Sequence, residues 1–275
     1  MFIDVLTALA VVVSIGLILG ILLALFIHFF SVQEDEKTKQ IRAALPGINC
    51  GACGFKGCND YAEALAKGAA KPNLCVPGGE NTANELGAIL GVKAEKIQNK
   101  VAFVHCNGNT EATAEKAVYL GLPSCQARSM IFGGPKACAY GCLGCGDCAN
   151  VCRSNAISIQ NGIAKVNTDR CMGCGMCAKE CPRGLISMIP ATAATAVFCH
   201  NCEKGADARK ACKNACIGCK KCEKACSEQA ITVVNNCAVI DYTKCSGCGL
   251  CAEACPTACL KKVQLPATSP KVYLS

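Results

Sequence analysis

Residues 142–182 read CLGCGDCANVCRSNAISIQNGIAKVNTDRCMGCGMCAKECP, and this stretch decides the fold of the chain. It contains two runs of four cysteines with the same spacing, Cys-x2-Cys-x2-Cys-x3-Cys, and a proline follows the second run. Thiolates at this spacing are ligands of iron–sulfur clusters. Between the runs, short apolar segments flank Asn161-Gly162, a pair that favours a tight hairpin turn. The stretch therefore predicts a small fold that is organised around metal clusters.

The spacing is that of bacterial two-cluster ferredoxins, in which the fourth cysteine of each run ligates the other cluster. We therefore expect each cluster to take three ligands from one run and one from the other. The expected sets are Cys142, Cys145, Cys148 with Cys181, and Cys171, Cys174, Cys177 with Cys152. Arg153 stands where the usual first run has proline, which alters the local turn but removes no ligand.

The same module recurs after 74 residues, the offset from Cys142 to Cys216. Lys136-Ala-Cys138 recurs as Lys210-Ala-Cys212 at this offset, and Cys125 recurs as Cys199. An internal repeat this strict indicates one electron-carrying unit that is used twice. The recurring motif cysteines are Cys216, Cys219, Cys222, Cys226, Cys245, Cys248, Cys251 and Cys255.

A separate cysteine motif occupies residues 50–79. Its expected ligands are Cys50, Cys53, Cys58 and Cys75, with three in a glycine-rich loop and the fourth after a short helix over residues 59–68. Glycines in such a loop permit sharp turns and let backbone N–H groups approach inorganic sulfide. A second helical stretch is expected from residue 81, ending at residue 90 or continuing to residue 99. A zinc ion could use the same four thiols, so zinc stays an alternative here.

The N-terminal segment Val5–Phe30 contains no Asp, Glu, Lys or Arg. Its length is sufficient to cross a bilayer as one helix. A cleavable signal peptide is disfavoured because no basic residue precedes the apolar stretch. Basic residues follow it at Lys37, Lys39 and Arg42, which favours a cytoplasmic location for the rest of the chain. We expect a single-pass protein of the cell membrane, anchored in the lipid bilayer by one helix, with a very short outside N-terminus.

Composition narrows the function classes. The chain has 28 cysteines, only 5% aromatic residues and no Trp. Disulfide scaffolds are typically short secreted chains, whereas this chain has 275 residues and thiols in triplets and quartets. The net charge of +8 omits the negative charge of ligated clusters, and aromatics that could stack on bases are scarce, so no nucleic-acid partner is expected.

Two groups of residues allow more than one interpretation. Some unassigned cysteines either are small buried apolar residues or complete further clusters, and Cys138 could compete with Cys145 as a ligand of one cluster. A basic group beside the second module is either a solvated face or a docking surface for an acidic redox partner. The unassigned cysteines are Cys106, Cys125, Cys138, Cys199, Cys202, Cys212, Cys237 and Cys259. The basic residues are Lys204, Arg209, Lys210, Lys213, Lys220, Lys221 and Lys224.

These observations predict an α+β chain. It comprises one N-terminal transmembrane helix, a small 4Fe-4S domain and two bacterial 2[4Fe-4S] ferredoxin-like modules organised around clusters. The expected divisions are a transmembrane anchor at 1–32, a 4Fe-4S domain with a helical spacer at 33–100, a connecting segment and first module at 101–190, a second module at 191–262, and a tail at 263–275. At least five [4Fe-4S] clusters are expected, and no catalytic, flavin or nucleotide motif is visible.

The order of parts resembles the B subunit of the Rnf ion-translocating electron-transport complex, in its long two-module form. The anchor, the CGACGFKGC…LCVPGG domain, the GGPKACAYGCLGCGDC segment and the ferredoxin module carry this resemblance. It implies an electron relay within a ferredoxin:NAD oxidoreductase that moves Na+ or H+. The implied partners are soluble reduced ferredoxin and the other membrane and peripheral subunits of the complex. Alternatives are a polyferredoxin subunit of another membrane reductase or hydrogenase, or a membrane-tethered zinc or metal scaffold.

Overall fold

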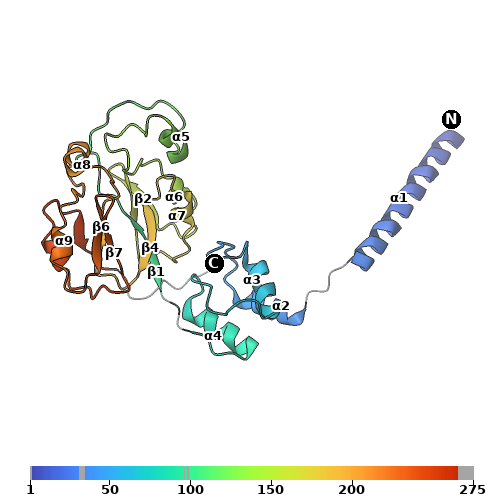
Figure 1. Ribbon diagram of the computed structural model, residues 1–275. Coiled ribbons are helices and arrows are strands. Elements are labelled where there is room, and N and C mark those ends of the chain that lie inside the picture. The colour runs from blue at the N-terminus through green and yellow to red at the C-terminus, as the bar shows by residue number, and fades with distance from the viewer. Residues whose placement is uncertain (1, 31–34, 96, 98, 266–275) are drawn as a thin grey trace.

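A computed structural model describes residues 2–30, 35–95, 97 and 99–265. Helix α1 (Phe2–Phe30) stands apart from the rest of the chain (Figure 1). Within it, Val5–Phe26 is long and apolar enough to cross a membrane, and none of it is buried against the protein. Exposure of an apolar helix to water on all sides is energetically unfavourable. In a bilayer, lipid contacts the apolar side chains, and the helix needs no protein partner.

Three helices form the small N-terminal domain: α2 (Glu36–Ala44), α3 (Cys58–Ala66) and α4 (Gly79–Leu90). Ile41, Tyr61 and Leu86 meet in its core. The Tyr61 hydroxyl donates to the Lys71 carbonyl over 2.6 Å and accepts from the Leu74 N–H over 3.3 Å. These two bonds fix the segment that leads to Cys75. Helices α3 and α4 lie where the sequence predicts helices, within two residues at each end.

The first module contains two antiparallel strand pairs. Strand β1 (Lys100–Val104) pairs with β4 (Ile186–Pro190), and β2 (Ile157–Gln160) pairs with β3 (Ile163–Val166). Asn161 and Gly162 form the β2–β3 turn with φ of 49° and 74°, values that suit an Asn-Gly turn. The short helices of this module are α5 (Cys125–Met130), α6 (Asp147–Asn150) and α7 (Met176–Glu180).

The second module repeats this arrangement. Strand β5 (Thr195–Val197) pairs with β8 (Leu260–Lys262), and β6 (Ile231–Val234) pairs with β7 (Cys237–Ile240). Its helices are α8 (Gly205–Ala211), α9 (Lys221–Lys224) and α10 (Leu250–Glu253). Strand β5 lies near the start of the range expected for the second module. Most of the expected C-terminal tail, from residue 266 on, lies outside the described residues.

The two modules pack directly on one another and form the main body in Figure 1. The Phe103 and Phe198 rings meet edge to face with centroids 4.8 Å apart. The His105 ring bridges the Val197 carbonyl, at 2.7 Å, and the Ser187 hydroxyl, at 2.6 Å. The expected α+β fold class is confirmed. Cysteines occupy many of the buried positions in the core of the body.

Candidate iron–sulfur centres

The first Cys-x2-Cys loop of each run in the modules turns at a glycine with positive φ. These glycines are Gly144, Gly173, Gly218 and Gly247, with φ of 71°, 71°, 64° and 80°. Only glycine adopts this conformation at little cost. The turn lets the chain reverse direction sharply between the two cysteines of each loop.

Backbone N–H groups point at several cysteine sulfurs. The Ala164 N–H donates to Cys142 Sγ over 3.4 Å and the Ala156 N–H donates to Cys152 Sγ over 3.3 Å. The Ala230 N–H makes the corresponding bond to Cys226 Sγ in the second module, over 3.4 Å. Such donors stabilise thiolate charge and tune the potential of a bound cluster. The second module therefore repeats part of the electrostatic environment of the first.

The first site lies in the N-terminal domain. Burial, and then repulsion from the thiolates of Cys50, Cys58 and Cys53, raises the pKa of Cys75 to about 11. The Cys58 N–H is held by the Asn49 side-chain oxygen at 2.8 Å. The structure thus brings together the four cysteines expected for this domain. A cation bound between them would relieve the repulsion that otherwise disfavours four thiolates.

Two sets of the first module adjoin one another. Burial, followed by the proximity of Cys171, Cys174 and Cys152, raises the pKa of Cys177 to about 12. This is the expected crossed set, with three thiols from the second run and one from the first. Cys174 also lies close enough to Cys50 to raise the pKa of that thiol, although burial contributes more. The N-terminal domain therefore presents its site to the first module.

The other set of the first module differs in one member from the sequence prediction. One pocket is lined by Cys142, Cys148, Cys181 and, unexpectedly, Cys125. Cys145 is not among the lining residues; its thiol lies beside Cys125 and shares a hydrogen bond with it. No spacing rule relates Cys125 to the run that begins at residue 142, so the sequence offered no signal for this role.

Cys138 lies elsewhere. The sequence left open whether Cys138 competes with Cys145 for one cluster, and the structure places Cys138 in a different pocket from that of Cys148 and Cys181. It is buried there, with 5% of its surface exposed. The two cysteines are therefore not neighbours around one site.

The second module also brings its expected sets together. Cys226, Cys245, Cys248 and Cys251 line one pocket, again with three thiols from one run and one from the other. Cys222 is buried beside Cys216 and Cys219, and burial with their charge raises its pKa to about 11. Cys255, the expected fourth member of that set, has its Sγ 3.6 Å from Cys259 Sγ. Cys237 and Cys259 are buried beside Cys216, positions that sequence reasoning left unassigned.

The spacing of the thiols in these sites distinguishes a single metal ion from a cluster. Four sulfurs around one zinc ion lie about 4 Å apart, since each Zn–S bond is about 2.3 Å. Within the described part of the chain, no three His, Cys, Asp or Glu side chains converge closely enough to hold a single ion. The sets instead surround pockets that also have Leu143 or Ile231 in their walls. Thiols arranged around such a pocket suit a four-iron cube.

Exposure differs between the sets. Cys219 and Cys248 are exposed, whereas the other cysteines of the sets are buried or half-buried. Both exposed thiols belong to the second module. Water and a partner protein can therefore approach the second module's sites more closely than those of the first module.

These crossed sets of thiols on paired two-stranded sheets define a polyferredoxin, a class of electron-transfer protein that binds multiple [4Fe-4S] clusters. Family models agree with this class. Residues 45–77 match an Fe-S cluster family, residues 141–185 match the 4Fe-4S dicluster domain, and residues 238–261 match the 4Fe-4S binding domain.

Relatives match most of the chain. It is 42% identical over 246 residues to the B subunit of the Na(+)-translocating ferredoxin:NAD(+) oxidoreductase complex of Acetobacterium woodii, covering 89% of this chain and 74% of that protein. It is 42% identical to the proton-translocating counterpart of Clostridium ljungdahlii, covering 93% and 91%. It is 34% identical to the B subunit of an ion-translocating oxidoreductase complex of Methanosarcina acetivorans, covering 90% and 95%. The chain belongs to this family of B subunits.

Proposed function

We propose that this chain is the electron-relay subunit of a membrane-bound, ion-translocating ferredoxin:NAD oxidoreductase. It accepts electrons from reduced soluble ferredoxin and passes them to partner subunits of the complex. When bound, [4Fe-4S] clusters supply one-electron carriers that change oxidation state with little rearrangement. The single observation that supports this role best is the succession of adjoining thiol sets that runs through the first module, from Cys148 beside Cys177 to Cys174 beside Cys50.

The second module offers the surface for electron input. The seven basic residues around it are all exposed, and several lie on α8 and α9 along one side of the body (Figure 1). Lys220 and Lys221 directly follow the exposed Cys219. Positive charge steers an acidic protein into a transient encounter. An acidic ferredoxin would thus dock where the thiols are least covered.

The first site offers the surface for electron output. It lies in the domain that directly follows α1 in the chain, so it is the site nearest to the anchor in sequence. The basic residues Lys37, Lys39 and Arg42 follow the apolar helix and favour the cytoplasmic side for the body. Partner subunits in the membrane would receive electrons there.

The chain itself does not move the ion. Between Val5 and Phe30 it has no Asp, Glu, Lys or Arg, and an ion pathway needs polar groups at membrane depth. In this proposal the ion pathway belongs to partner subunits. The relatives are named for Na+ in one organism and for protons in another, which fits an ion choice made outside the shared relay subunit.

Anaerobic purification of the full chain from membranes tests the proposal. We expect a brown protein with about 20 or more Fe per chain, several overlapping [4Fe-4S] signals in electron paramagnetic resonance (EPR), and copurifying subunits that react with NAD. Reduced ferredoxin should reduce the clusters within the time of stopped-flow mixing. A folded, colourless protein loaded with zinc, or one that reduced ferredoxin leaves oxidised, would contradict the proposal.

A further inference from the structure

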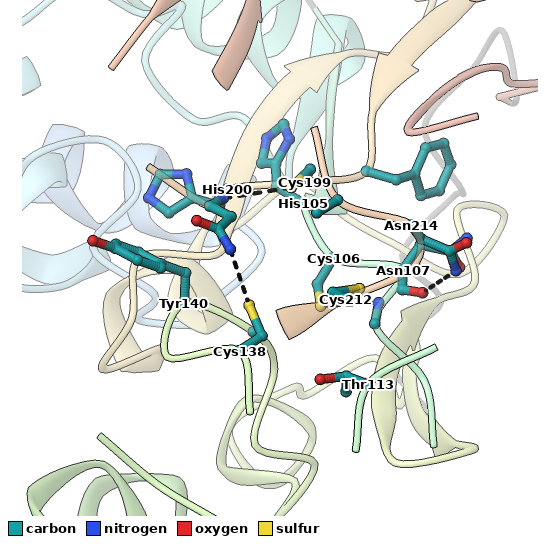
Figure 2. Close-up of a pocket in the computed structure, with 15 residues that line it drawn as sticks. His105, Cys106, Asn107, Thr113, Cys138, Tyr140, Cys199, His200, Cys212 and Asn214 are labelled. Atoms are coloured by element: carbon teal, nitrogen blue, oxygen red, sulfur yellow. Dashed lines mark hydrogen bonds between the residues drawn. The ribbon is translucent and has the colours of Figure 1, made fainter. Parts of the chain in front are cut away.

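Four cysteines outside the five sets line one pocket at the junction of the two modules. They are Cys106, Cys138, Cys199 and Cys212 (Figure 2). Cys106, Cys138 and Cys212 are buried, and Cys199 is half-buried. In the sequence the outermost two are more than a hundred residues apart, and each module supplies two of the four.

Cys106 and Cys199 occupy equivalent places in their modules. Cys106 follows β1 by two residues, and its Sγ accepts from the Gly108 N–H at 3.4 Å and the Cys142 N–H at 3.3 Å. Cys199 follows β5 by two residues, and its Sγ accepts from the Asn201 N–H at 3.5 Å and the Cys216 N–H at 3.2 Å. Each sulfur thus accepts hydrogen bonds from two backbone N–H groups, which would stabilise negative charge on a metal-bound sulfur.

The structure changes the repeat assignment of Cys199. The offset of 74 residues pairs Cys199 with Cys125, but the strands and hydrogen bonds pair it with Cys106. The connection from Cys106 to Cys138 is longer than that from Cys199 to Cys212, so a constant offset misses the match. Cys138 and Cys212 keep the offset. The pocket is therefore formed by the same two positions of each module.

The four thiols are close enough to affect one another. Burial raises the pKa of Cys212 to about 11, and the charges of Cys138, Cys106 and Cys199 add to that effect. The Asn201 side chain, 1% exposed, points its Nδ2 at Cys138 Sγ over 3.6 Å. Amide donors of this kind surround metal-bound sulfur rather than neutral apolar cysteines.

A buried cation lies beside the pocket. Lys136 is 4% exposed, and its Nζ donates to the Gly108 carbonyl at 3.3 Å and the Gly162 carbonyl at 2.7 Å. Within the described residues it forms no ion pair with a carboxylate. A buried ammonium group needs compensating negative charge. Four thiolates that ligate a cluster carry net negative charge and would supply it.

Hydrogen bonds connect the two modules around the pocket. The Thr113 hydroxyl donates to the Ala211 carbonyl at 2.7 Å, and the Asn214 side chain donates to the Asn107 carbonyl at 2.8 Å. The Lys213 N–H donates to the Ala112 carbonyl at 2.8 Å. These bonds tie the two modules together and preorganise the four thiols.

We propose that Cys106, Cys138, Cys199 and Cys212 bind a further [4Fe-4S] cluster that joins the two modules. Four thiols lose their protons as four Fe–S bonds form, with no change of oxidation state required of the protein. Through the Cys142 and Cys216 N–H bonds, the site is directly adjacent to one ligand set in each module. Its role as the connection between modules rests on the proposed relay function, whereas binding of the cluster does not.

Iron analysis of the full chain tests the site. Wild-type protein should hold about 24 Fe, and Cys138→Ala/Cys212→Ala should hold about four fewer and lack one EPR signal. The matched control is Cys202→Ala, because Cys202 lies three residues from Cys199 but does not line the pocket. The control should keep all of its iron. A double variant with undiminished iron and an unchanged spectrum would overturn the proposal.

Alkylation of the wild-type holoprotein keeps the proposal testable if the double variant fails to fold. Under anaerobic conditions, Cys106, Cys138, Cys199 and Cys212 should resist iodoacetamide until a chelator removes iron, while Cys202 reacts at once. Labelling of the four before iron removal, or protection that follows zinc content instead of iron, would contradict the site.

Failure of this site and failure of the relay function give different results. If only this site is wrong, the protein still holds about 20 Fe, still reacts with reduced ferredoxin, and is unaffected by Cys138→Ala/Cys212→Ala. If the relay function is wrong, reduced ferredoxin leaves every cluster oxidised, whatever the iron count of this site.

Discussion

Cys125 and Cys145 lie side by side at one pocket of the first module. Cys125 faces the pocket with Cys142, while Cys145 hydrogen-bonds to Cys125 at its edge. The Asp147 carboxylate holds the start of α5, because it accepts from the Ser124 hydroxyl at 2.9 Å and the Gln126 N–H at 3.2 Å. Position along the run favours Cys145 as a ligand, whereas position in space favours Cys125.

We expect either thiol to serve as the fourth ligand. Cys145→Ala and Cys125→Ala should each keep the cluster, because the other thiol lies beside the one that is removed. The double variant should lose about four Fe. Iron analysis and EPR of the three variants decide the matter. Loss of the cluster in Cys145→Ala alone would make Cys145 the sole fourth ligand, as the ferredoxin spacing suggests.

At the scale of the element, the glycine turns of the Cys-x2-Cys loops are not equivalent. A Cβ on Gly144 would lie 2.5 Å from the Gly162 carbonyl oxygen, whereas a Cβ on Gly247 would meet the Ala194 side chain at 3.2 Å. Both positions have positive φ, which costs an alanine about 1 kcal/mol or more. Only the first adds a clash with backbone that cannot rotate away.

Gly144→Ala should therefore lower stability more than Gly247→Ala. For Gly247→Ala we expect the strain of about 1–2 kcal/mol alone, with all clusters retained. For Gly144→Ala the β2–β3 turn must shift, so a lower melting temperature and a partial loss of iron are expected. Thermal unfolding under anaerobic conditions, followed by iron analysis, compares the two. Equal losses would show that the backbone approach at Gly144 is unimportant.

The helices, turns and cysteine positions differ in how well the sequence predicted them. Local signals predicted the hairpin at Asn161-Gly162 and the helices α3 and α4, because a turn or cap depends on adjacent residues. The roles of Cys106 and Cys125 could not be predicted. Cys125 meets Cys142, Cys148 and Cys181 with no fixed spacing to that run, and Cys106 meets Cys199 and Cys212 only when the second module packs on the first.

At the scale of the whole molecule, the two modules are packed together, but apart from the proposed junction site the thiol sets of each module come from that module alone. Cys174→Ser should damage one cluster of the first module and leave the second module's clusters intact, because no thiol of Cys216 to Cys255 contacts Cys174 among the interactions described. EPR spectra of the variant and of wild-type protein should differ by one signal, or by conversion of that signal to a three-iron type. Loss of every cluster would show that the modules fold and load as one unit.

The same variant should interrupt the relay near the anchor. Cys174 is the thiol of the first module that lies beside Cys50. Reduced ferredoxin should still reduce the second module at its normal rate, while reduction of the N-terminal site slows. Rapid freeze-quench EPR separates the two. Slowed reduction of the second module would mean that electrons enter at the N-terminal domain instead.

The charge distribution of the molecule makes a last prediction about where ferredoxin docks. Lys221 and Lys224 lie exposed on α9, close to the exposed thiol of Cys219. If steering brings an acidic ferredoxin there, Lys221→Glu/Lys224→Glu should slow reduction about tenfold or more at low ionic strength. The difference should shrink as salt rises, since charges are screened beyond about 8 Å at physiological ionic strength. The matched control, Lys71→Glu/Lys93→Glu in the N-terminal domain, makes the same change in net charge away from α9, and it should have little effect. Equal slowing in both variants would point to net charge alone, and no slowing in either would place the docking surface elsewhere.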